Sequence, residues 1–165
     1  MRGYDYLQFI GNKAFFSNAE LRFPIIEAAL TPLGVVGGLR GVAFANFGAS
    51  QVSPNRLNVW DSHPVNVVPI VNYNQDFITG AITPVYGQPT TISGFRLVDG
   101  EASYGIGLET FALGFPIHFD WAWRTLFNKA WEDYQFAYQA TINGYSSGST
   151  WFRKPHFSVW IGYDF

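Results

Sequence analysis

The last nine residues of the chain alternate between large apolar side chains and side chains that are mostly small or polar. The apolar series is Phe157, Val159, Ile161, Tyr163 and Phe165, and the residues between them are Ser158, Trp160, Gly162 and Asp164. A period of two places alternate side chains on opposite faces of a β-strand. A strand with one uniformly apolar face is typical of the wall of a transmembrane β-barrel, where that face contacts lipid.

Four further segments show the same alternation and predict antiparallel strands. The predicted strands are 13–25, 38–48, 103–112, 115–124 and 156–165, joined by turns at 26–36 and 113–115 and by long loops at 49–102 and 125–155. Long loops on one side and short turns on the other are typical of outer-membrane barrels. No segment predicts a helix. We therefore predict an all-β fold, an antiparallel transmembrane β-barrel segment of about five C-terminal strands with two long extracellular loops.

Composition narrows the class of protein only in part. Of the 165 residues, 19% are aromatic and 13% are charged, and the mean hydropathy is +0.04. These values fit a barrel with a lipid face and a polar interior, and they also fit a soluble β-sandwich or lipocalin-like barrel. The net charge of −2 argues against a nucleic-acid surface. The sequence has no cysteine, which excludes disulfides and thiolate metal sites.

Several short motifs follow one another in a defined order. They are Arg2-Gly3-Tyr4, Asn18–Pro24, Leu39–Gly48, Tyr104–Leu108 and Gly114–Asp120, followed by the aromatic final strand. The series resembles the C-terminal barrel of the BamA/TamA-type bacterial surface-antigen family, in particular the barrel appended to TolB-like propeller proteins. The resemblance implies an outer-membrane location, contact with outer-membrane lipid, and a role in membrane anchoring or in the assembly or translocation of outer-membrane proteins. We accordingly expect a non-enzymatic protein without a cofactor.

The resemblance also implies a lock inside the barrel. The tripeptide Arg2-Gly3-Tyr4 matches the motif of a loop that folds into the lumen, where the family's Arg pairs with an Asp on the wall. Asn46 stands at the matching position of this sequence. Because a lumen arginine needs a counter-charge, we expect Glu20 or Glu109 to supply it.

Two other groups of residues are candidates for function. The predicted lumen charge network consists of Arg22, His118, Asp120 and Arg124. The final strand resembles the signal that the barrel-assembly machinery recognises, with Ser158, Tyr163 and Phe165 at the matching positions. Such a signal works by adding a strand to an exposed sheet edge. The expected partners are this machinery and the remainder of a longer barrel chain or an upstream domain.

The predicted strands are too few to close a barrel on their own. No apolar segment of the kind found in signal peptides follows residues 1–5. We therefore expect the chain to be the C-terminal part of a longer protein and not to fold as a lone monomer in detergent.

Two alternative hypotheses use the same residues differently. A soluble all-β ligand-binding module would place the aromatic side chains in its core, around an internal cavity. A membrane-embedded hydrolase would use Ser146, because Gly144–Gly148 has the spacing of a nucleophile elbow, although its surroundings predict a loop. His118 and Asp120 are suited to general acid–base chemistry, but a self-satisfied charge network is the simpler interpretation. His63 and His156 are isolated in the sequence, so no metal site is predicted.

Overall fold

The structure is a computed structural model that describes residues 1–4, 11–31, 34–52, 56–112, 115–142 and 154–162. For 28–31, 34–37, 112 and 136–142 it describes the backbone alone. The chain divides into two compact units. Unit 1 comprises Met1–Leu57, Glu101–Arg124 and Pro155–Phe165, and unit 2 comprises Asn58–Gly100 and Thr125–Lys154.

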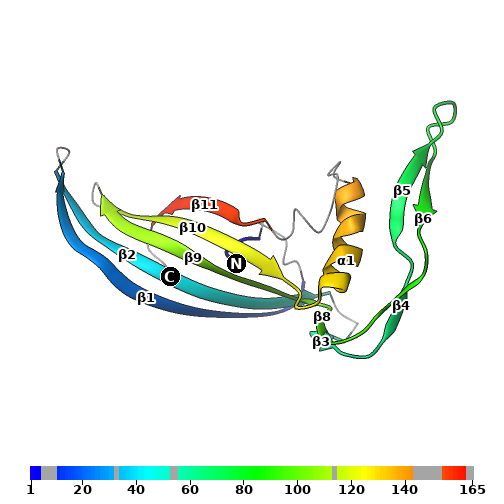
Figure 1. Ribbon diagram of the computed structural model, residues 1–165, viewed down its shortest axis with the longest axis horizontal. Helices are drawn as coiled ribbons and strands as arrows, with labels where there is room; N and C mark the ends of the chain where they lie inside the picture. The colour runs from blue at the N-terminus through cyan, green and yellow to red at the C-terminus, as the bar shows by residue number, and fades with distance from the viewer. Residues whose placement is uncertain (5–10, 32–33, 53–55, 113–114, 143–153, 163–165) are drawn as a thin grey trace. The chain divides into compact units, whose positions relative to one another are not determined.

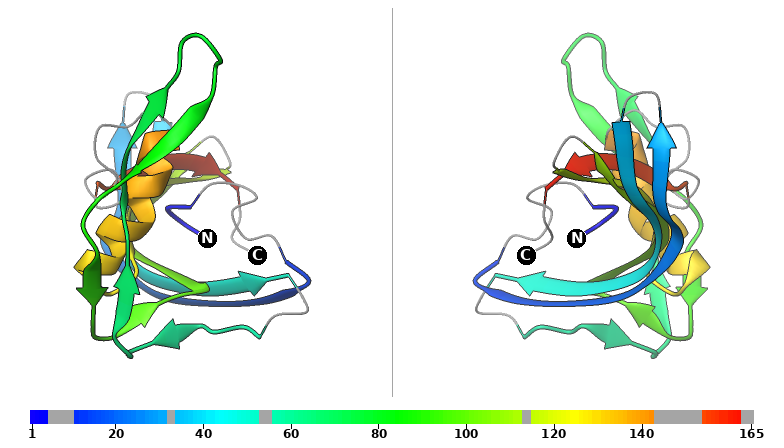
Figure 2. Two further views of the ribbon diagram at one scale, coloured as in Figure 1. Left: turned by 90° about the vertical axis from the view of Figure 1, so that its right-hand side faces the viewer. Right: turned by 90° about the vertical axis from the view of Figure 1, so that its left-hand side faces the viewer.

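Unit 1 is built on a five-stranded sheet. Its strands are β1 (Lys13–Thr31), β2 (Gly34–Gln51), β9 (Gly100–Ala112), β10 (Phe115–Thr125) and β11 (His156–Ile161). They lie side by side in chain order (Figure 1) and form a strongly curved sheet (Figure 2). The prediction of a mostly β fold with antiparallel sheets is confirmed. Within the described residues β1 and β11 are the two edges, so this part of the sheet is open.

The sheet buries the polar side of its strands and exposes the apolar side. In β10 the buried residues include His118, Asp120 and Arg124, whereas the large apolar residues between them are only half-buried. In β11 Phe157, Val159 and Ile161 are exposed. We call the polar face the side that carries Glu20, Asn46, Ser103, Asp120 and Ser158, and the apolar face the side that carries Leu21, Ala45, Tyr104, Trp121 and Val159.

The first two strands are longer than predicted. Pairing between them continues to Thr31 and Gly34, so the predicted turn at 26–36 is wrong. The register shifts between Pro24 and Ile26, which marks a β-bulge. Proline cannot donate to the ladder and is therefore usual near a strand end, but here a bulge accommodates Pro24 within the strand.

Much of the predicted loop 49–102 is ordered into short strands of unit 2. These strands are β3 (Trp60–Asp61), β4 (Val65–Val67), β5 (Ile70–Gln75), β6 (Ile82–Tyr86), β7 (Thr90–Ile92) and β8 (Arg96–Leu97). They pair antiparallel as β3–β8, β4–β7 and β5–β6. The segment therefore runs out and back as nested two-stranded ladders (Figure 1).

The predicted absence of a helix is wrong, because α1 (Lys129–Ile142) lies within the predicted loop 125–155. Asn128 caps the helix, with its Oδ1 accepting a hydrogen bond from the backbone N–H of Trp131 at 3.1 Å. Aromatic residues at 134, 136 and 138 resemble a strand pattern, but the alanines and glutamines around them favour a helix. Among the described residues, no helix is long and apolar enough to cross a membrane.

Candidate functional site

Residues 1–4 dock on the polar face, inside the curve of the sheet (Figure 2). The Tyr4 hydroxyl donates to the Ala102 carbonyl at 2.9 Å, and the Ser103 hydroxyl donates to the Arg2 carbonyl at 2.7 Å. Gly3 has a φ of +86°, and a Cβ there would lie 2.8 Å from the Cβ of Ala122. Because this position needs both positive φ and the absence of a side chain, it favours glycine.

Arg2 connects two strands that are not neighbours in the sheet. Its guanidinium lies 2.9 Å from Glu20 on β1 and 3.3 Å from Asp120 on β10, and β2 and β9 separate these strands. The same group lies 4.7 Å from the centre of the Phe44 ring on β2. The carboxylates are largely shielded, with side-chain exposures of 13% and 2%. Arg2 therefore holds opposite parts of the curved sheet through charge-assisted contacts.

Among the described residues, neither Asn46 nor Glu109, the other predicted lock residues, pairs with the Arg2 guanidinium. Asn46 donates to the Ser103 hydroxyl at 3.2 Å, and that hydroxyl donates to the Arg2 carbonyl, so Asn46 reaches Arg2 through Ser103. Glu109 lies 3.8 Å from Arg22 and 3.9 Å from Arg40 instead. Asp120 is also paired with Arg2, and the sequence did not predict this pair.

The four residues of the predicted charge network all lie on the polar face, but they have different partners. Arg22 pairs with Glu20 at 2.8 Å. Arg124 donates from its Nε to the Gly3 carbonyl, and its guanidinium lies 5.2 Å from the centre of the Tyr4 ring. Glu20 and the docked residues 2–4 therefore link Arg22, Asp120 and Arg124. His118 instead stacks on Trp160, which also donates to Asp120.

Trp160 organises the end of the polar face nearest the β11 edge. Its ring stacks on His118 with a centroid separation of 3.6 Å and an interplanar angle of 2°. Its Nε1 donates to the Asp120 carboxylate at 2.8 Å. The sequence marks Trp160 only as the one bulky residue on the polar side of the strand, so its role was missed.

The predicted assembly signal is described only in part. Ser158 lies opposite Asp120 in the β10–β11 register. Tyr163 and Phe165 lie outside the described residues, as does Ser146 of the hydrolase hypothesis.

The polar groups of this cluster contact one another and the backbone. The Asp120 carboxylate receives both Arg2 and Trp160, while the imidazole of His118 packs on an indole and lies 3.2 Å from the Gly162 carbonyl. Among the described residues, His118 makes no hydrogen bond with Asp120. The same part of the chain holds no group of three or more side chains that could bind a metal ion. The network positions residues 2–4 and β11 on the sheet.

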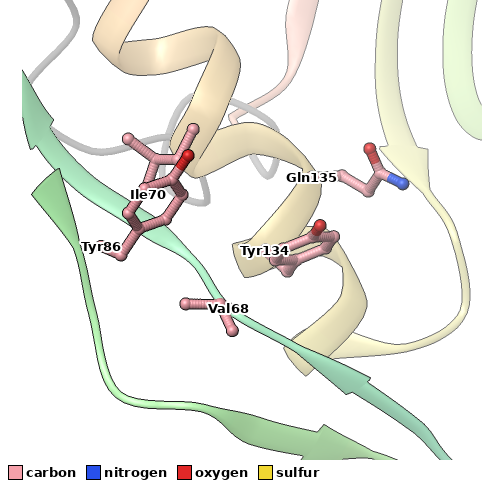
Figure 3. A pocket seen from close by; sticks show the side chains of 5 residues that line it. All are labelled: Val68, Ile70, Tyr86, Tyr134 and Gln135. Carbon is pink, nitrogen blue, oxygen red and sulfur yellow. The ribbon is translucent and has the colours of Figure 1, made fainter. Parts of the chain in front are cut away.

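Each unit also carries a pocket. A cavity of about 340 Å³ in unit 2 is lined by Val68, Ile70, Tyr86, Tyr134 and Gln135 (Figure 3). A second, of about 490 Å³, lies at the far end of the unit 1 strands and includes Arg40 and Glu109. The first pocket lies between α1 and the β5–β6 hairpin, outside the five-stranded sheet.

A compact charged cluster also lies in unit 2. Asp61 accepts hydrogen bonds from the backbone N–H of His63 at 3.0 Å and from its Nδ1 at 2.7 Å, and it pairs with the buried Arg96 at 3.0 Å. The backbone hydrogen bond from His63, followed by the side-chain bond, lowers the pKa of Asp61 to about 2. Asp61 therefore carries its negative charge throughout the neutral range.

Comparisons of this chain with models of known protein families, with curated protein sequences and with solved structures found no match.

Proposed function

We propose that the five-stranded sheet is part of the wall of a transmembrane β-barrel and anchors the protein in the bacterial outer membrane. The observation that carries this proposal is the reversed burial of the sheet. Charged side chains such as Asp120 are buried on the polar face, while Leu21, Ile106 and Ile161 on the other face are 57–68% exposed. In water this arrangement is unfavourable, because each large apolar side chain gains about 1.5–3 kcal/mol on burial. A bilayer removes that cost.

Strand lengths support a spanning role. A transmembrane β-strand needs about 9–11 residues. β1 has 19 residues, β2 has 18, β9 has 13 and β10 has 11. Each is long enough to cross the hydrocarbon layer. The ordered motifs that resemble surface-antigen barrels support the same proposal.

The two sheet edges support a role in assembly. Within the described residues each of β1 and β11 pairs on one side only, so its other side can accept a further strand. In this proposal the remaining strands of a longer barrel pair there, and the barrel-assembly machinery engages β11. The polar network holds the wall in shape and performs no chemical reaction.

Photo-crosslinking tests the proposal directly. A photoreactive amino acid at Ile106 or Ile161 is expected to form adducts with phospholipid acyl chains in membranes that contain the protein. The matched control is Ser158, which lies on the polar face of the same strand as Ile161 and is expected to form no lipid adduct. Absence of lipid adducts at both apolar positions would overturn the proposal.

A further inference from the structure

Three exposed aromatic side chains of unit 2 form a continuous row. Trp60 and Phe95 have ring centroids 5.8 Å apart, and Phe95 and Phe127 have centroids 5.9 Å apart. Their residues are 58%, 47% and 59% exposed, respectively. We call these three residues the aromatic row. Packed apolar patches of this kind on a protein surface mark sites of interaction.

The backbone holds Phe127 outward in an unusual conformation. Its φ of 62° lies in the left-handed region, which bulky residues seldom adopt. The N–H of Phe127 donates to the Thr125 hydroxyl at 2.9 Å, and the N–H of Leu126 donates to the Glu132 carboxylate at 2.9 Å. The fold therefore maintains an unfavourable backbone geometry at the residue that extends the row.

The aromatic row lies outside a core that is already complete. Leu97 is 2% exposed and Trp131 is 8% exposed, and the Trp131 Nε1 donates to the Leu97 carbonyl at 2.6 Å. Arg96 stacks on Trp131 at 5.2 Å and pairs with Asp61. By contrast, the indole N–H of Trp60 makes no recorded hydrogen bond with the described residues. An aromatic ring with an available polar edge suits a boundary between apolar and aqueous surroundings.

Two parts of the chain beside the aromatic row follow or precede the long strands closely in sequence. Phe127 is two residues beyond the end of β10 at Thr125, and two residues span at most about 7 Å. Leu97, three residues before β9 begins, donates from its N–H to the Leu126 carbonyl at 3.0 Å and pairs with Trp60. In the proposed function, on which this inference rests, β9 and β10 leave the hydrocarbon layer at these ends.

We propose that the aromatic row is an interfacial anchor that inserts between the lipid headgroups where β9 and β10 emerge from the bilayer. Aromatic residues, and Trp above all, prefer this level of a membrane. The partner is the lipid surface itself, contacted by the rings of Trp60, Phe95 and Phe127 from outside the strands.

Single-cysteine labelling tests this proposal, because the chain has no native cysteine. An environment-sensitive fluorophore is attached to Trp60→Cys or Phe127→Cys in the full chain, reconstituted in phospholipid vesicles. We expect a blue-shifted emission, quenching by nitroxide lipids labelled at the headgroup, and loss of quenching by aqueous iodide. The matched control is Thr83→Cys on β6, which is exposed and polar and is expected to be quenched by iodide.

A fourth probe separates this inference from the proposed function. Ile106→Cys lies on the apolar face and is expected to be quenched by nitroxides deep in the acyl chains. If Ile106 is lipid-exposed while positions 60 and 127 behave like position 83, the anchor is refuted and the wall proposal stands. Probes at 60 and 127 that are shielded from both iodide and lipid nitroxides would indicate a protein partner and also refute the anchor. If Ile106 itself is exposed to water, the proposed function fails as well.

Discussion

The sheet of unit 1 and the core of unit 2 differ in which side chains they bury. On the sheet, buried positions hold Asp120, His118 and Arg124, and many of the large apolar groups face outward. In unit 2, Leu97 and Ile92 are each 2% exposed, as expected for an apolar core in water, although Arg96 is buried and Trp60, Phe95 and Phe127 are exposed. The core of unit 2 therefore follows the burial rule for proteins in water, and the sheet does not. The proposed explanation is that the apolar face of the sheet contacts lipid, whereas water surrounds most of unit 2.

The largest expected effect on stability comes from removing Asp120, the carboxylate that both Arg2 and Trp160 contact on the polar face. Asp120→Ala leaves Arg2 and Trp160 without their common acceptor, so we expect the free energy of unfolding to fall by about 3 kcal/mol. Denaturant titration of the protein folded in vesicles measures this loss. Asp120→Asn keeps an acceptor for Trp160 and should lose less. A loss for Asp120→Ala below about 1 kcal/mol, the value of an exposed pair, would place the polar face in water.

A pair of neighbouring substitutions tests the apolar face. Val159→Arg places a charge on the exposed apolar face of β11, and near the bilayer midplane it should cost about 2–4 kcal/mol of stability. Ser158→Arg adds the same side chain on the polar face, opposite Asp120, and should cost much less. The comparison uses unfolding in vesicles. Equal losses at the two positions would remove the distinction between the faces.

A smaller loss of stability is expected from removing the N-cap of α1 in unit 2. Asn128→Ala removes the acceptor for the Trp131 N–H and should destabilise α1 by about 1 kcal/mol. Hydrogen exchange of the helix amides measures the change. Asn128→Ser, which restores a capping oxygen, is the control. Unchanged exchange in the alanine variant would show that the cap does not hold the helix.

The smallest expected effect is the loss of the stabilising contribution of Asp61 at acid pH. The folded-state pKa of Asp61 is depressed to about 2, below its ordinary value of 3.8, so its stabilising contribution is complete above about pH 4. That contribution is lost as the pH falls through 2. Carboxyl-carbon NMR should report a midpoint near 2, and Asp61→Asn should remove this part of the acid sensitivity. A midpoint near 4 would show that the His63 contacts do not form.

The sequence predicts part of the fold because the alternation of large apolar and polar side chains along a strand is a local signal. In β10 and β11 every second residue is large and apolar, so strand and faces follow from period two alone. The signal fails at Pro24, where the bulge shifts the register, and in α1, where aromatics at alternate positions imitate a strand. It also fails in β3–β8, because four of these strands have only two or three residues, and β5 and β6 show no regular alternation of large apolar residues.

The candidate site was predictable only where a motif carried it. The motif at residues 2–4 suggested Glu20 or Glu109 as a partner for Arg2, and Glu20 lies 2.9 Å from it, whereas Glu109 pairs with Arg22 and Arg40. The contact between Arg2 and Asp120 depends on the curvature of the sheet, because three strand spacings separate β1 from β10. No local pattern encodes that curvature. The stacking of Trp160 on His118 likewise depends on the β10–β11 register.

The close packing of Gly3 on Ala122 has a consequence for the order of folding. Residues 2–4 contact β1 through Glu20, β9 through Ala102 and Ser103, and β10 through Ala122 and Arg124. These strands are distant in sequence, so the docking surface exists only after they have come together. We therefore expect residues 2–4 to dock late in folding, so that their ordering indicates that β1, β9 and β10 have already assembled.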